Sequence, residues 1–85
     1  MKDFTYVIKD ELGIHARPAG LLVKEVKKFE STVTIAVGDK KAVAKGIMGI
    51  MQLGVEKGNE VTVSADGPDE DAAIAALKDF FEANL

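Results

Sequence analysis

The fold is decided by residues 13–29, which read GIHARPAGLLVKEVKKF. From position 19 onward the apolar residues recur at steps of three and four, which places them on one side of a helix. These residues are Ala19, Leu22, Val23, Val26 and Phe29. Pro18 suits the first turn of that helix, because its missing N–H removes no hydrogen bond there. The stretch therefore predicts an amphipathic helix that begins near Ala16 and covers another apolar layer.

The segments on either side of this helix alternate apolar and polar residues, which is the period of a strand with one face on a core. These segments are residues 4–8, 33–37, 40–44 and 61–65. Gly38-Asp39 offers a two-residue turn between the middle pair. A short helix is expected within residues 46–54, and a second amphipathic helix with an acidic first turn follows Gly67-Pro68.

The expected order of elements is βαββαβα, within a single domain spanning residues 1–85. Four strands with one apolar face can be covered by helices, so we expect an α+β, two-layer open-faced sandwich with a four-stranded antiparallel sheet. The composition, 47% hydrophobic and 29% charged, does not resemble that of a disordered chain.

Composition also excludes several classes of function. The chain has no cysteine, so it has no disulfide and no thiolate nucleophile. No apolar run is long enough to span a bilayer, and residues 1–4 lack the apolar stretch of a secretory signal, so we expect a cytoplasmic protein. The net charge of −3 argues against nucleic-acid binding. Residues 1–45 nevertheless carry nine Lys or Arg against six Asp or Glu, and they contain the only histidine.

That histidine, His15, lies where the first long helix is expected to begin. A helix N-terminus has unpaired backbone N–H groups and a positive dipole end, which together favour a phosphate. The same field disfavours a protonated imidazole, so a neutral ring nitrogen would be free to attack phosphorus. The guanidinium of Arg17 can take two phosphate oxygens at once, and Pro18 would keep the first turn ordered. The simpler interpretation is that both charged residues are only solvated surface groups.

The chain resembles the HPr family, the histidine phosphocarriers of the bacterial phosphotransferase system. Residues 13–19, GIHARPA, match the active-site motif of the family, and residues 45–54, KGIMGIMQLG, are similar to its second characteristic segment. The resemblance covers essentially the whole chain, and two separated motifs are more specific than one short pattern.

The resemblance implies a carrier that is not a turnover enzyme. His15 would accept a phosphoryl group on Nδ1 from phosphorylated Enzyme I, which is charged from phosphoenolpyruvate, and would donate it to sugar-specific Enzyme IIA proteins. Arg17 and the N–H groups at Ala16 and Arg17 would bind the phosphate beside Pro18. No metal, organic cofactor, nucleic acid or membrane insertion is implied, and we expect a monomer.

A partner-binding surface is expected beside His15. Ile47, Met48 and Met51 lie on a helix too short to bury them all, and methionine adapts to several partners. Filling of core gaps is the alternative for both methionines. Lysines could form a basic rim that steers acidic partners. The full set of expected partner-binding residues is Gly20, Leu21, Lys24, Lys27, Lys45, Ile47, Met48, Met51 and Gln52.

Gly46 and Gly20 are unusual for their positions, the first compared with the family and the second compared with the composition of helices. In many family members a regulatory serine occupies the position of Gly46, so serine control should be missing here. Gly20 lies inside a helix, where glycine costs about 1 kcal/mol relative to alanine. It either lets a partner approach closely or has no role.

Alternative functions remain open at this point. A regulatory paralogue of a nitrogen-related system would also carry a phosphoryl group on the histidine, but it would act in a different pathway from sugar uptake. A non-catalytic α+β interaction module would leave His15 and Arg17 as surface residues. A small RNA-binding domain is disfavoured, because the strands lack an aromatic stacking platform. The sequence does not indicate which sugars or acceptors would be served.

Overall fold

The computed structural model describes all residues from Met1 to Leu85. The elements in chain order are β1 (Lys2–Val7), α1 (Ala16–Val26), β2 (Thr32–Val37), β3 (Lys40–Val43), α2 (Ile47–Met51), β4 (Glu60–Asp66) and α3 (Glu70–Asn84). The predicted order βαββαβα is therefore confirmed.

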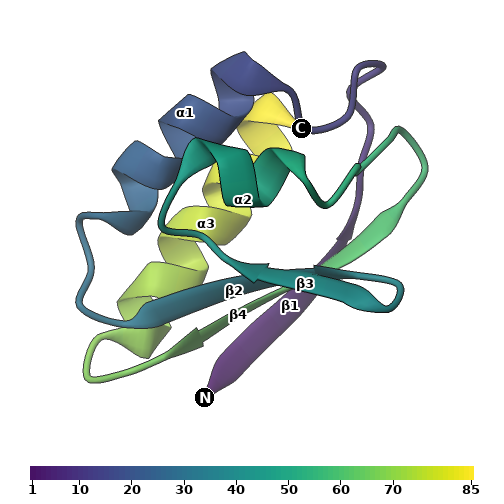
Figure 1. Cartoon of the computed structure of the whole chain (residues 1–85). Coiled ribbons are helices and arrows are strands. Elements are labelled where there is room, and N and C mark those ends of the chain that lie inside the picture. The colour runs from purple at the N-terminus through teal and green to yellow at the C-terminus, as the bar shows by residue number, and fades with distance from the viewer.

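The four strands form one antiparallel sheet in the order β1-β4-β2-β3. All three helices lie on the same side of this sheet, and the other face has no covering layer (Figure 1). The predicted open-faced sandwich is confirmed. The N-terminal end of α1 and the C-terminal end of α3 lie at the same end of the helical layer, whereas the chain begins at the opposite end (Figure 1).

The core lies between the sheet and the two long helices. Phe81 of α3 is fully buried, and its ring meets those of Phe4 and Tyr6 edge-on, with centroids 5.8 and 5.7 Å apart. Leu22 of α1 and Leu77 of α3 are also fully buried. Burial of each such side chain contributes roughly 1.5–3 kcal/mol to the stability of the fold. The helices are therefore anchored to the sheet by their apolar faces, as the periodicity predicts.

Two details differ from the periodic pattern. The pattern extends to Phe29, but α1 ends at Val26, and Phe29 lies half-buried in the following turn and packs against the core. α2 is only five residues long, and Ile50 is its one buried residue. No helix is both long enough and apolar enough to cross a membrane.

Candidate functional site

His15 is the N-cap residue of α1, with extended backbone angles (φ −112°, ψ −175°). Its carbonyl accepts the first helical bond, from the N–H of Ala19 at 2.9 Å. No side chain caps this helix end, and the N–H groups of Ala16 and Arg17 have no hydrogen-bond partner in the protein. The imidazole therefore lies at a helix end that retains its donors and its positive dipole.

The loop before His15 is fixed by a close approach to the segment before β4. Gly13 has a φ of +66°, and a Cβ at this position would lie 2.1 Å from the carbonyl oxygen of Val55. The N–H of Ile14 donates to that same oxygen at 3.2 Å, and the Ile14 side chain is buried. Only glycine can occupy position 13 without displacing the loop, so this residue helps to set the place of His15.

The imidazole opens onto a hollow of about 360 Å³. The residues that line it are Asp10, His15, Arg17, Pro18, Leu21 and Asn84. The His15 side chain is 36% exposed, so a visiting group can reach it. The expected trio of His15, Arg17 and Pro18 is thus brought together at one accessible surface. A nucleophilic ring nitrogen, a guanidinium and free backbone donors can together bind a phosphate and exchange it.

Two residues of this hollow were not expected from the sequence. Asp10 Oδ1 lies 3.9 Å from His15 Nε2. Asp10 lies in the turn that precedes the motif, where an acidic residue is unremarkable. Asn84 lies at the C-terminal end of α3, and no pattern in the sequence links it to His15.

The residues expected to bind partners lie mostly at the surface of α1 and α2. Met48 is 69% exposed and Met51 is 40% exposed, so neither methionine is a core filler. Leu21 and Ile47 are also exposed. Gln52, Lys24, Lys27 and Lys45 are exposed as well, whereas Gly20 is half-buried. Methionine and aliphatic side chains at the surface of a short helix are typical of a protein-binding patch.

Gly20 faces α2. A Cβ at this position would lie 3.7 Å from Ile47 Cδ1, which is an ordinary van der Waals contact. Gly46 is the N-cap of α2, and no atom lies within 4 Å of the position that its Cβ would take. The structure therefore has room for a side chain at both glycines.

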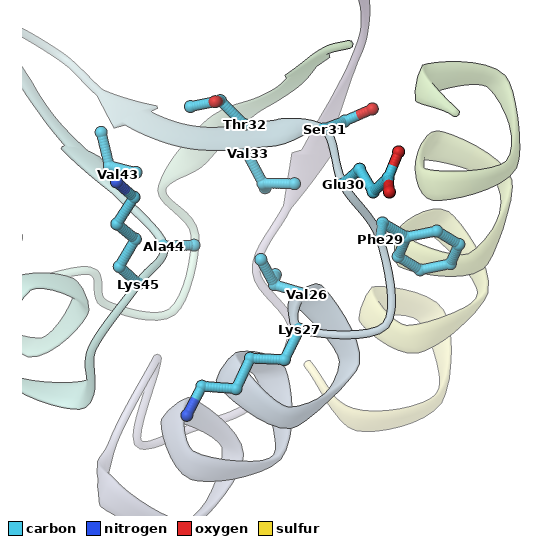
Figure 2. A pocket seen from close by; sticks show the side chains of 10 residues that line it. All are labelled: Val26, Lys27, Phe29, Glu30, Ser31, Thr32, Val33, Val43, Ala44 and Lys45. Carbon is cyan, nitrogen blue, oxygen red and sulfur yellow. The ribbon is translucent and has the colours of Figure 1, made fainter. Parts of the chain in front are cut away.

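A larger hollow, of about 530 Å³, lies away from His15. Figure 2 shows it between the end of α1, the turn that follows, the start of β2 and the end of β3. Lys27 and Lys45 both line it, whereas Lys24 does not. Two of the three expected rim lysines thus share one depression. No group of three or more His, Cys, Asp or Glu side chains could hold a metal ion.

Comparisons with known proteins agree with this geometry. Residues 2–83 match the family described as the phosphotransferase system HPr component phosphorylation site. The chain is 45% identical over 78 residues to the phosphocarrier protein HPr of Mycoplasma capricolum, covering 92% of this chain and 88% of that protein. It is 44% identical over 85 residues to the HPr of Mycoplasma genitalium, covering 99% and 97%.

Solved structures show the same fold. A crystal structure of HPr from Thermoanaerobacter tengcongensis superposes with a TM-score of 0.91 at 51% identity, over 98% of this chain and 93% of that one. A structure of an HPr dimer from the same organism matches with a TM-score of 0.76, over 98% and 95%. The fold and the sequence thus point to the same group of proteins.

Proposed function

The chain belongs to the HPr family of phosphocarriers of the phosphotransferase system, and from that premise we propose that His15 is the residue that holds the phosphoryl group. The observation that supports this most is the partly exposed imidazole at the N-cap of α1, next to the unpaired N–H groups of Ala16 and Arg17. A phosphoryl group on that ring, with about two negative charges near neutral pH, would accept hydrogen bonds from both.

Each neighbour of His15 has its own part in the proposal. The guanidinium of Arg17 shares the phosphate charge with the backbone donors. Pro18, which is buried in the first turn of α1, keeps those donors in place before the phosphate arrives. The phosphate-binding set is therefore Ala16, Arg17 and Pro18.

The donor in this proposal is phosphorylated Enzyme I, and the acceptors are sugar-specific Enzyme IIA proteins. The exposed patch of Leu21, Ile47, Met48 and Met51 would dock them in turn, because flexible apolar side chains can pack against different surfaces. The lysines at positions 24, 27 and 45 have no ion-pair partner within the chain, so they are free to attract acidic partners.

The carrier would act as a monomer in the cytoplasm, where its partners present their phosphoryl groups. All residues of the proposed site come from one chain, so a second copy is not needed to complete it. The dimer described for the similar protein of T. tengcongensis makes the oligomeric state worth measuring together with activity.

The test is to incubate the protein with Enzyme I, magnesium and phosphoenolpyruvate, and to measure the mass of the intact chain. We expect an acid-labile gain of one phosphoryl group that is absent in His15→Ala. Arg17→Ala should keep the gain but reach it more slowly, with an unchanged circular dichroism spectrum. Absence of the gain in the parent protein would contradict the proposal, and a persistent gain in His15→Ala would move the site to another residue.

A further inference from the structure

The carboxylate of Asp10 lies beside the His15 ring, on the side of Nε2. The distance from Oδ1 to Nε2 is 3.9 Å, and the two side chains are 33% and 36% exposed. Arg17 is the other charged residue that lines the hollow, and Asn84, from α3, is uncharged. Asp10 is therefore the only anionic side chain among the residues that line this hollow.

Asp10 is held in place by hydrogen bonds at three of its atoms. Its N–H donates to the carbonyl of Leu85 at 2.8 Å, and its carbonyl accepts the N–H of Gly13 at 3.0 Å. Its Oδ1 accepts the N–H of Leu12 at 2.9 Å. These bonds fix both the backbone and the carboxylate. An ionised carboxylate has about four lone-pair sites, so the bond to Leu12 leaves room for another donor.

A neutral imidazole carries one N–H, and the group that meets one ring nitrogen decides which nitrogen keeps its lone pair. A carboxylate only accepts hydrogen bonds, so it favours a proton on the nitrogen that faces it. We propose that Asp10 is a positioning residue that keeps the His15 proton on Nε2 and so presents Nδ1 as the nucleophile. This role rests on the proposed function of His15 as the phosphoryl carrier.

The separation of 3.9 Å is longer than a hydrogen bond. Side-chain contacts of this kind are often long in unliganded proteins and shorten when the substrate binds. The torsion that turns an imidazole ring is also broad and soft, so a small rotation of His15 changes this distance at little cost. The fixed partner in the pair is Asp10, and the adjustable one is the ring.

The same placement stabilises the product of the transfer. The lone pair of His15 Nδ1 forms the new bond to phosphorus, while the bond from phosphorus to the donor breaks and its electron pair stays with the donor. The proton on Nε2 remains, so the ring gains positive charge as the new bond forms. The carboxylate of Asp10 lies where this charge develops, which is where a fixed charge contributes most. Transfer to an acceptor reverses each step.

The test compares Asp10→Asn with Glu11→Gln. The asparagine keeps an oxygen for the N–H of Leu12, because asparagine forms the same local turn as aspartate, so the loop should remain folded. The control removes an equal charge from the neighbouring residue, whose side chain is 87% exposed and does not line the hollow. The readouts are the ¹⁵N chemical shifts of the neutral His15 ring, measured without any partner, and the rate of phosphoryl transfer.

We expect the Nε2–H tautomer in the parent protein and in Glu11→Gln. In Asp10→Asn the tautomer ratio should change by at least about threefold, and transfer should slow by about tenfold. An unchanged tautomer ratio in Asp10→Asn overturns the inference, as does an equal change in Glu11→Gln or a shifted tautomer with an unchanged rate. The proposed function fails separately, because it fails only if the parent protein is not phosphorylated at His15.

Discussion

The N-termini of α1 and α3 have opposite electrostatic surroundings. The first turn of α1 has no acidic residue and carries the cation Arg17, and no side chain caps it. The first turn of α3 carries Glu70 and Asp71. A helix N-terminus attracts negative charge, and α3 supplies that charge from its own sequence, whereas α1 does not.

The acidic residues at the start of α3 also tie distant segments together. Asp69 accepts hydrogen bonds from the N–H of Glu30, the N–H of Ser31 and the hydroxyl of Ser31. Glu70 accepts the N–H of Gly67 and pairs with the N-terminal ammonium of Met1 at 3.0 Å. One end of the helical layer is therefore stabilised by internal charges, while at the other end the N–H groups of Ala16 and Arg17 have no hydrogen-bond partner. Proteins commonly forgo local stability at sites that bind and react.

The largest effect is expected from giving α1 an acidic first turn like that of α3. In Ala16→Asp the new carboxylate interacts favourably with the helix dipole, so the free energy of unfolding should rise by up to about 1 kcal/mol. It also repels the incoming phosphoryl group, so transfer to His15 should slow by about tenfold to a hundredfold. Rates measured against Ala16→Asn, which differs only in charge, separate repulsion from steric blocking. Equal transfer rates in the two variants would show that the uncompensated positive end of α1 does not affect phosphoryl transfer.

A smaller effect is expected at α3 from Asp69→Asn. The bond from the Ser31 hydroxyl, and next the bond from the N–H of Glu30, hold the pKa of Asp69 below its ordinary value of 3.8. Stability from this carboxylate is therefore present above the ordinary pKa and is lost as pH falls through the lower pKa of the folded state. Urea unfolding should show Asp69→Asn to be less stable at neutral pH, with a difference that shrinks below about pH 4.

The control for that measurement is Asp39→Asn, which removes an exposed carboxylate from the turn between β2 and β3. It should unfold like the parent at every pH. Asp69→Asn should also accept phosphate on His15 at the parent rate, because the acidic end of the layer is separate from the hollow at His15. A slower transfer would couple the two ends and weaken the contrast between them.

The smallest effect is expected from Gly20→Ala, in the part of α1 that faces α2. The new methyl group meets Ile47 at an ordinary contact distance, so no strain arises. Alanine inside a helix is more favourable than glycine by about 0.5–1 kcal/mol, and thermal unfolding should shift upward accordingly. A lower melting temperature would show that glycine is required there for packing against α2.

Much of the fold follows from the sequence, because its signals are local. Alternation along residues 33–37 and the helical period from Ala19 to Val26 depend on neighbours within one turn or one strand. The motif around His15 is equally local, since the N-cap, the guanidinium and the proline lie within four consecutive residues. The short helix predicted that some of Ile47, Met48 and Met51 stay exposed, and the family resemblance favoured exposure of both methionines, which the structure has.

Contacts between residues that are far apart in the sequence could be identified only from the tertiary structure. No periodicity links Ser31 to Asp69, which lie 38 residues apart, or brings Asn84 to the hollow at His15. The sheet order β1-β4-β2-β3 likewise depends on pairing between distant strands. Asp10 is near His15 in sequence, yet its position depends on the hydrogen bond to Leu85 that holds its backbone. The position of His15 at the start of α1 follows from the amino-acid sequence, because the helix and its N-cap are set by short-range order. The groups that surround the His15 side chain follow from the fold, because Asp10 and Asn84 come from separate segments that only packing of the core brings together.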